Sequence, residues 1–268
     1  MIATRTIKRG LIPALGASFA CATLALLPAV SPSAAANHPV SIASGIHSTV
    51  KFGGQHIGSI AKANPAAARN GYNINGYNWS GAAKTGSGFT SVKSTWTEPS
   101  VTCNSTNDLM APWVGIDGYG TNTVEQTGVA TDCSSGHPVY QAWYEMYPKA
   151  PVYYSLSSYP VGAGDKINAT VSRSGSTYTL TLNNSSRGWT KTTVQTANDR
   201  NGSAEVIIES PTAAYPKFGT VSFSNSTING TSLGSWNPTL MDASNSGGYE
   251  DHTSAVSGGS FSITYLRE

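Results

Sequence analysis

Residues 140–148 have the sequence Tyr-Gln-Ala-Trp-Tyr-Glu-Met-Tyr-Pro. Trp143, Glu145 and Tyr147 occupy every second position, and in a β-strand such residues point to the same face. Two large aromatic rings around one carboxylate form a poor hydrophobic core, whereas they suit the lining of a substrate groove. The stretch therefore predicts a β-strand with one face turned to a ligand.

Short β-prone segments continue on both sides of this stretch, from residue 71 onward. They are separated by Gly, Asn, Ser and Pro at intervals of about 8–12 residues, as in all-β sandwiches and barrels. No segment beyond the N-terminal region shows a convincing apolar period of 3.6 residues. The sequence therefore predicts one all-β domain over residues 71–268, with a sandwich favoured over several small domains.

Strict alternation identifies positions of the predicted core. Apolar residues recur at every second position in two of the expected strands, and in a third Val92 and Trp96 share a face with Ser94, so these faces are interpreted as buried and need no functional explanation. These positions are Val92, Trp96, Ile167, Ala169, Val171, Tyr178, Leu180 and Leu182.

The N-terminal 36 residues have the features of an export signal. Three basic residues precede an apolar stretch, and Ser33-Ala-Ala-Ala36 supplies a small-residue cleavage site. A membrane anchor is the alternative, but prolines interrupt the apolar run. We expect residues 1–36 to be removed, giving a secreted protein without membrane association. Residues 37–70 are weakly patterned and are interpreted as a pro-segment or N-terminal extension.

Removal of the signal leaves two cysteines, Cys103 and Cys133. Disulfides persist in exported proteins, so an even count favours one bridge. The bridge closes a loop of about thirty residues, which stabilises the fold by roughly 3 kcal/mol in the chain-entropy model. Two free buried thiols are the alternative.

Charged residues are few, with 16 basic and 14 acidic side chains in 268 residues. The signal holds three of the bases and none of the acids, so the exported chain has 13 bases and 14 acids, a net charge of −1. It has no basic patch, and nucleic acid is not expected as a partner. Few carboxylates also limit charge repulsion and ion-pair loss, which is compatible with an acidic environment.

Several reaction classes lack their motifs. No HExxH or CxxC sequence is present, so neither a metal site nor a cofactor is expected. Gly230-Thr-Ser-Leu-Gly234 matches the string of a serine-hydrolase nucleophile motif. That motif needs a strand before it and a helix after it, and Ser-Trp-Asn-Pro238 predicts no helix. A turn is the better interpretation.

Carboxylates inside apolar strands are the remaining candidates. In Ala204-Glu-Val-Ile-Ile-Glu209, Glu205 and Glu209 share one face, while Val206 and Ile208 share the other. Such a strand fits a sheet with one face in the core and the other forming a cleft floor. A solvated outer face is the alternative. Two carboxylates and aromatic rings over a cleft also suit a glycosidase, so a carbohydrate-binding or carbohydrate-hydrolysing sandwich is the second hypothesis.

Six short segments follow one another in the order found in a known family. They are Asn78-Trp-Ser-Gly81, Trp113-Val-Gly-Ile-Asp-Gly118, Gln126-Thr-Gly-Val129, Ala142-Trp-Tyr-Glu-Met-Tyr-Pro148, Gly164-Asp165 and Ala204-Glu-Val-Ile-Ile-Glu209. Together they resemble the glutamic peptidases, also called eqolisins, over most of the expected domain.

This resemblance implies a β-sandwich of two antiparallel sheets, each of about seven strands, with a concave face as the substrate groove. It implies an acid endopeptidase acting on polypeptide substrates. We expect the protein to be a monomer. Gln126 and Glu205 match the family's catalytic glutamine and glutamate. The positions that match the groove near this dyad are Trp113, Asp117, Trp143, Glu145 and Tyr147.

Three positions depart from the family pattern. Val206 and Met146 stand where tryptophan is usual, and Glu125 stands where an apolar residue is common. Alternation turns Glu125 away from Gln126, and we expect its side chain to reach solvent.

A single glutamate acting as base and then acid works near its own pKa, which predicts an optimum at about pH 3–5. Glu145 or Glu209 is expected to raise that pKa, and Gln126 to lower it.

Overall fold

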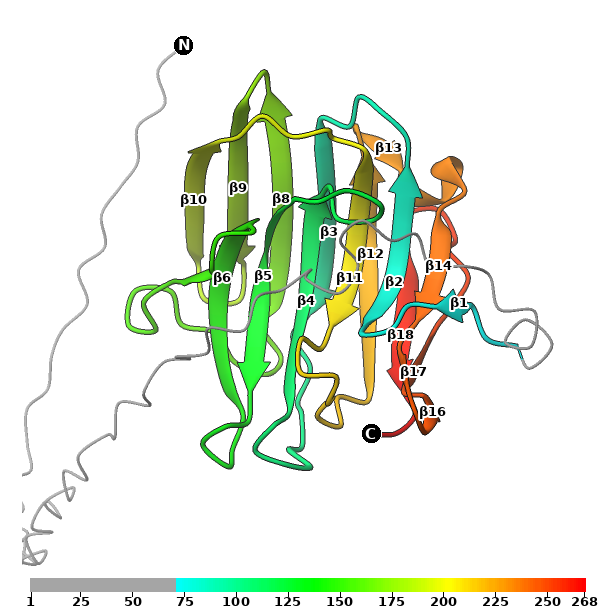
Figure 1. Cartoon of the computed structure of the whole chain (residues 1–268). Coiled ribbons are helices and arrows are strands. Elements are labelled where there is room, and N and C mark those ends of the chain that lie inside the picture. The colour runs from blue at the N-terminus through cyan, green and yellow to red at the C-terminus, as the bar shows by residue number, and fades with distance from the viewer. Residues whose placement is uncertain (1–70) are drawn as a thin grey trace, which may run out of the picture. The chain divides into compact units, whose positions relative to one another are not determined.

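A computed structural model describes residues 71–268 of the chain. The predictions for the signal segment and for residues 37–70 lie outside these described residues. Two large sheets pack face to face (Figure 1). In the described part, the only helix is a short 3-10 turn, η1 (Leu233–Trp236), and no helix there is long and apolar enough to cross a bilayer.

Sheet 1 contains eight strands and carries most of the segments singled out in the sequence. All its pairs are antiparallel except the one between its first two strands at the edge, which is parallel. In spatial order the strands are β1 (Ile74–Asn75), β14 (Thr239–Asp242), β2 (Trp79–Thr85), β11 (Ser203–Glu209), β4 (Leu109–Ile116), β5 (Val124–Asp132), β6 (Val139–Tyr147) and β7 (Val152–Tyr153).

Sheet 2 is antiparallel and has seven strands in its main path. They are β10 (Trp189–Thr196), β9 (Thr177–Asn184), β8 (Lys166–Ser174), β3 (Ser91–Thr97), β12 (Thr220–Ile228), β18 (Phe261–Tyr265) and β17 (Asp251–Thr253). The short β13 (Thr231–Ser232) pairs with β12, while β15 (Ser244–Asn245) and β16 (Gly248–Tyr249) form a separate hairpin. The predicted all-β sandwich of two antiparallel sheets is confirmed.

Turn chemistry fixes the alternation of strands such as β8 and β9. Their hairpin turns at Gly175-Ser176, where the glycine has a φ of 59°, a left-handed conformation that costs glycine little. The register pairs Val171 with Leu180 and Ala169 with Leu182, so the apolar faces of the two strands coincide. The hydrophobic pattern and the turn therefore specify the same register.

The main core lies between the two sheets. The eight positions predicted from alternation are each at most 1% exposed and belong to one apolar cluster, which confirms that prediction. Val206 and Ile208 of β11 join the same cluster from sheet 1. Because side chains alternate along a strand, Glu205 and Glu209 point to the opposite face.

A second apolar cluster covers the face of sheet 1 that points away from sheet 2, which we call the site face. It includes Trp79, Trp113, Trp143, Ile207 and Met241, all fully buried. The rings of Trp79 and Trp113 meet edge to face with centroids 4.9 Å apart, a favourable geometry for aromatic pairs. The site face is therefore an aromatic layer that also carries carboxylates, as the spacing in residues 140–148 predicts.

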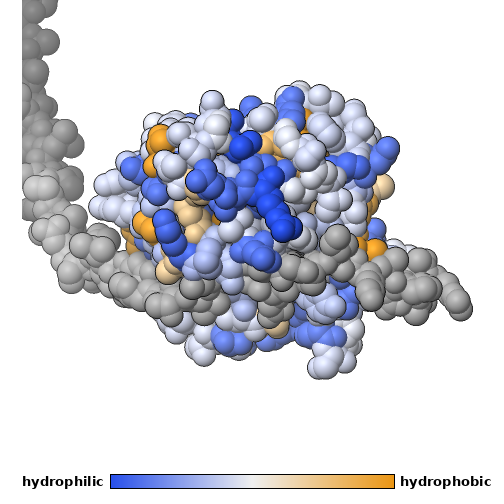
Figure 2. Space-filling model, turned by 45° about the horizontal axis from the view of Figure 1, so that its top comes forward, coloured by the Kyte–Doolittle hydropathy of each residue, from blue (hydrophilic) through white to orange (hydrophobic). Residues whose placement is uncertain are grey.

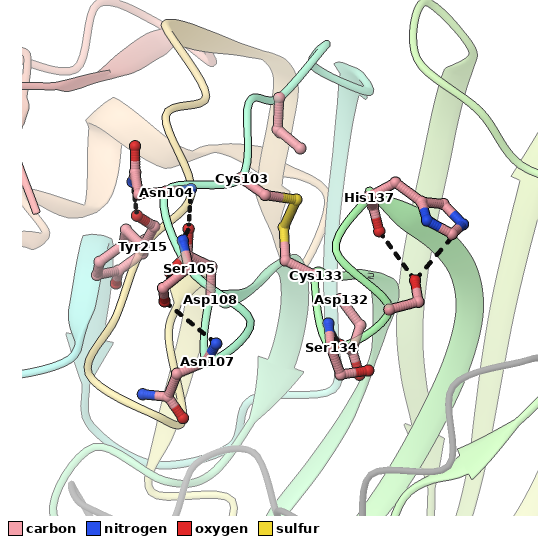
Figure 3. Close-up of a disulfide and its surroundings, with 12 residues drawn as sticks. Cys103, Asn104, Ser105, Asn107, Asp108, Asp132, Cys133, Ser134, His137 and Tyr215 are labelled. Atoms are coloured by element: carbon pink, nitrogen blue, oxygen red, sulfur yellow. Dashed lines mark hydrogen bonds between the residues drawn. A yellow bond between two sulfur atoms is a disulfide. The ribbon is translucent and has the colours of Figure 1, made fainter.

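Cys103 and Cys133 form the predicted disulfide (Figure 3). The bridge joins the segment before β4 to the residue that follows β5, and the Cys133 N–H also donates to the Asp108 carbonyl. The alternative of two free thiols was wrong. The disulfide thus ties together the two strands that hold Trp113 and Gln126.

The surface of the described domain is mainly polar. Figure 2 shows hydrophilic and weakly polar residues over most of the visible described surface, with scattered hydrophobic ones. The exposed large hydrophobic residues are Tyr77, Val152, Val194 and Leu266. This surface matches the low charge and the high Ser, Thr, Asn and Gly content of the sequence.

Candidate active site

Four neighbouring strands place one row of residues across the centre of the site face. In the register, Glu205 of β11 is opposite Gly115 of β4, Gly115 is opposite Gln126 of β5, and Gln126 is opposite Glu145 of β6. Residues directly opposite in an antiparallel sheet project to the same face. The register thereby brings three polar side chains into one line, although they are up to 79 residues apart in the sequence.

Gly115 separates the two residues of the predicted dyad and has no side chain to fill the gap. A Cβ atom at this position would lie 2.8 Å from the Trp113 ring and 3.3 Å from the Gln126 Cβ. The first distance is shorter than ordinary contacts, so either the indole ring or the sheet must shift. The glycine therefore makes room for the Trp113 ring between Glu205 and Gln126.

We expect Gly115→Ala to lower kcat by about tenfold or more, because small displacements of catalytic groups are costly. The new methyl group pushes on Trp113 and Gln126 while the fold, held by the rest of sheet 1, persists. Steady-state kinetics with a circular dichroism spectrum of the purified variant check this. Unchanged kcat in the folded variant contradicts the role given to the glycine.

Glu205 is fully buried on the site face. Its Oε1 accepts a hydrogen bond from the Tyr119 N–H at 3.4 Å, and no described residue lies within hydrogen-bonding reach of Oε2. Burial raises the pKa of Glu205 well above its ordinary value, with the charge of Asp117 adding to the effect; the Ser203 hydroxyl and the Tyr119 N–H lower it. Glu205 thus holds its proton more strongly than an ordinary glutamate.

The charged neighbour of Glu205 differs from the one expected from the sequence. Glu145 and Glu209 were expected to raise its pKa and Gln126 to lower it, yet the causes are burial and Asp117 on one side and Ser203 and Tyr119 on the other. The register explains the difference for Glu145, because Gly115 and Gln126 stand between the two glutamates.

Gln126 is also fully buried, and its amide is oriented by the neighbouring strand. The Nε2 atom donates a hydrogen bond to Glu145 Oε2 at 3.2 Å. An amide nitrogen carries two hydrogens, so one remains for another acceptor. No described residue bonds to the amide oxygen. Glu145 therefore leaves Gln126 one N–H with which to bind a substrate oxygen.

The Asp117 carboxylate forms hydrogen bonds with the backbone that leads into β11. It follows β4 in a left-handed conformation, with a φ of 67°. Its carboxylate accepts hydrogen bonds from the N–H groups of Asn201 at 2.8 Å and Gly202 at 2.7 Å. Those residues lead directly into β11. Asp117 thus fixes the start of the strand that presents Glu205.

The aromatic residues of the predicted groove lie on the same face as the dyad. Trp113 and Trp143 are fully buried there, and Tyr147 packs against their cluster. The Trp113 Nε1 donates to Glu209 Oε2 at 3.2 Å, and the Asn78 side chain donates to the other oxygen of Glu209 at 3.1 Å. Glu209 therefore sets the orientation of the Trp113 indole.

Four residues around the dyad were not in the predicted site: Gly115, Tyr119, Ser203 and Glu209. Glu209 carried a signal, because it stands four positions after Glu205 in a strand. Ser203 stands two positions before Glu205, so alternation puts it on the same face. Gly115 and Tyr119 carried no comparable signal, since their importance depends on the pairing of β4 and on the loop after it.

Neither a metal site nor a serine-hydrolase nucleophile is supported by the described residues. Within residues 71–268, no group of three or more His, Cys, Asp or Glu side chains is arranged to hold a metal ion. Ser232 lies in β13 and is followed by the four-residue η1 rather than by a long helix. Its string match to a nucleophile motif therefore lacks the required context.

The chain resembles known proteins over most of the described domain. The model of the Peptidase A4 family matches residues 77–265. Aspergillopepsin-2 from Aspergillus niger is 32% identical over 221 residues, which cover 70% of this chain and 77% of that protein. Scytalidopepsin B from Scytalidium lignicola is 37% identical over 139 residues, covering 49% of this chain and 51% of that protein.

Solved structures have the same fold. A crystal structure of scytalido-glutamic peptidase with a transition state analog inhibitor matches with a TM-score of 0.63 and 26% identity, covering 71% of this chain and 99% of that one. The aspergilloglutamic peptidase from Aspergillus niger matches with a TM-score of 0.53 and 33% identity, covering 59% of this chain and 99% of that one.

Proposed function

The chain belongs to the peptidase A4 family, the glutamic peptidases, and is a peptide hydrolase; from this premise we propose that it is a secreted acid endopeptidase with Gln126 and Glu205 as its catalytic dyad. The observation that carries the assignment is the row in which Gly115 alone separates Glu205 from Gln126.

Peptide hydrolysis without a covalent intermediate needs three groups: a base for water, a donor for the oxyanion and an acid for the leaving nitrogen. Ionised Glu205 takes a proton from water as the water oxygen bonds to the carbonyl carbon. The Gln126 amide donates its remaining N–H to the oxygen that becomes negative. Glu205 then gives the proton to the nitrogen as the C–N bond breaks, which returns the carboxylate.

The surrounding residues support the two catalytic groups. Glu145 orients the Gln126 amide, and Asp117 holds the backbone before Glu205. Half-buried Tyr147 supplies an aromatic surface for the substrate chain, and the buried Trp113 and Trp143 belong to the cluster against which it packs. These roles follow the groove positions inferred from the family resemblance.

Digestion of casein or haemoglobin over about pH 2 to 7 tests the proposed activity. Pepstatin serves as the control, and it should not inhibit because the sequence contains no Asp-Thr-Gly pair of the aspartic-protease kind. Fragments released from the interior of the chain identify an endopeptidase. Absence of proteolysis combined with glycosidase turnover or glycan binding would instead support the carbohydrate hypothesis.

We expect kcat/KM to be highest at acidic pH, because one carboxyl that serves as base and then as acid works best near its own pKa. Burial and Asp117 raise the pKa of Glu205. The maximum should therefore lie above the ~4.3 of an ordinary glutamate. Initial rates on a peptide substrate across the pH range check this, and a profile still rising above about pH 7 contradicts the single-carboxyl cycle.

We further propose that residues 37–70 are a pro-segment removed on maturation, with the active protein starting near residues 70–77. The structure sharpens this expectation, since the Asn73 N–H and side chain both donate to the Asp242 carboxylate at 2.8 Å. A start no later than Asn73 preserves those bonds at the edge of sheet 1. N-terminal sequencing of secreted, active material checks the site, and a start at Asn37 in fully active protein argues against a pro-segment.

A further inference from the structure

Glu125 lies next to the catalytic glutamine but is not solvent-exposed, contrary to the expectation from the sequence. Its side chain is 1% exposed. Alternation does turn it to the face opposite Gln126, but there it meets the loop between β10 and β11. Glu125 and Asp199 of that loop line one cavity of about 260 Å³. A buried carboxyl thus sits where the family commonly has an apolar residue.

Asp199 is the neighbour with the largest effect on the Glu125 pKa, through a side-chain hydrogen bond and its charge, whereas Glu125 Oε2 has no hydrogen-bond partner among the described residues. Two ionised carboxylates have no hydrogen to share, so one of the pair must keep its proton. Burial, followed by the contact with Asp199, raises the pKa of Glu125 to about 10. Asp117 and Glu205 add smaller effects in the same direction. Glu125 therefore stays neutral throughout the acidic range and has a hydrogen to donate.

Other charged groups border this pair. Lys149 lines the same cavity. The pKa of Tyr178 in β9 is influenced by both carboxyl groups, which raise it, and by Arg173, which lowers it. None of these groups forms a hydrogen bond or an ion pair with Glu125. Asp199 is therefore the residue of the loop that interacts most strongly with Glu125.

The loop at residues 197–202 leads directly to the catalytic glutamate. Its far end is held by Asp117 through the N–H groups of Asn201 and Gly202, and the Tyr178 hydroxyl donates to Asn201 Oδ1 at 2.7 Å. Ser203 and Glu205 follow in β11. The first half of the loop is connected to β5 through Asp199 and Glu125.

We propose that Glu125 and Asp199 are a positioning pair: their shared hydrogen clamps the loop before β11 onto β5 and so sets Glu205 relative to Gln126. This inference rests on the proposed roles of those two catalytic residues. The pair does not touch the reacting atoms. It acts by joining the two strand segments that carry the dyad, Glu125 being adjacent to Gln126 and Asp199 six residues before Glu205.

A double-mutant cycle on kcat tests the clamp. We expect Glu125→Leu and Asp199→Ala each to lower kcat by about tenfold to a hundredfold with KM little changed, because the dyad is misplaced but the aromatic surface is intact. The double variant should be no worse than either single variant, since one interaction is lost in all three. Glu125→Gln keeps an N–H donor for Asp199 and should restore most of the kcat.

Glu250→Gln is the matched control. Glu250 is another buried carboxyl, with a pKa raised to about 7 by burial, but it is bonded to Asn245 in the hairpin of β15 and β16. Its kcat should match that of the unmodified enzyme. Thermal unfolding of every variant establishes that each is folded at the assay temperature.

The outcomes separate the clamp from the catalytic assignment. Wild-type kcat in Glu125→Leu or Asp199→Ala, losses that multiply in the double variant, or failure of Glu125→Gln to restore activity would each overturn the clamp. None of these results affects the dyad, which is tested independently by substitution of Glu205 and Gln126.

Discussion

Glu205→Gln should lower kcat by about 10³- to 10⁴-fold, at the upper end of what general acid–base catalysis contributes. The glutamine amide has nearly the same shape and can still accept the hydrogen bond from the Tyr119 N–H. It can neither take a proton from water nor give one to the leaving nitrogen. Burial already favours the neutral form of Glu205, so exchange for a neutral glutamine should leave the fold intact.

Gln126→Ala should lower kcat by about 10²- to 10³-fold, the usual effect of removing one oxyanion donor. The residual activity should exceed that of Glu205→Gln, since water can still be activated. Alanine also leaves Glu145 without the Gln126 amide, so the alternative Gln126→Met, which removes the donor at similar volume, accompanies it. The control is again Glu250→Gln. Full activity in purified, folded Glu205→Gln or Gln126→Ala contradicts the dyad.

Side-chain alternation was sufficient to predict which residues share the site face. Trp143, Glu145 and Tyr147 follow the period of two, as do Glu205 and Glu209, and the cluster memberships of their neighbours agree. Alternation is a property of each strand alone, so it can be read without knowing the partners of that strand. The family resemblance then supplied the roles.

The pairing between strands could not be predicted in the same way. That Gly115 comes to lie between Glu205 and Gln126 depends on the relative shift of β11, β4 and β5, which turns and core packing determine together. Without the register, a glycine in Trp-Val-Gly-Ile-Asp has no recognisable function. Its contribution is the absence of a side chain at one point in the sheet.

The contacts of Asp117 and Glu125 escaped sequence analysis for a related reason. Asp117 matched a groove position, yet its carboxylate is bonded to backbone N–H groups 84 and 85 residues away. Glu125 was assigned the correct face but the wrong environment, because the loop after β10 covers it. Long-range contacts made by loops leave no period in the sequence.

Buried carboxyls with raised pKa values make the stability of the domain depend on pH. Burial is the first cause in each case: it raises the pKa of Glu98 to about 8 and that of Glu125 to about 10, and it raises the pKa of Asp251 well above the ordinary value. Asp251 also accepts hydrogen bonds from the Ser80 hydroxyl and the Ala243 N–H. The folded domain thus holds protons that the unfolded chain releases at lower pH.

The sign of the effect follows from proton linkage. Between the pKa of an exposed carboxyl, about 4, and the raised pKa of the folded state, the folded chain binds more protons than the unfolded chain. The free energy of unfolding therefore falls by roughly 1.4 kcal/mol per pH unit for each such group. The contribution is complete below about pH 4 and is lost as the pH rises through the folded pKa, about 8 for Glu98.

We therefore expect the mature domain to be most stable in acid and to unfold as the pH rises from about 5 to about 9, since two or three such groups outweigh a typical stability of about 5–15 kcal/mol.

Glu98→Gln tests the cause. The glutamine oxygen can still accept the hydrogen bond that the Trp96 indole donates to Glu98 at 2.8 Å, but it does not titrate. Urea unfolding at several pH values should give a slope shallower by roughly 1.4 kcal/mol per pH unit up to about pH 8. A free energy of unfolding that is constant or rises with pH over this range would show that these carboxyls are ionised in the folded protein, and that their burial does not set its working pH.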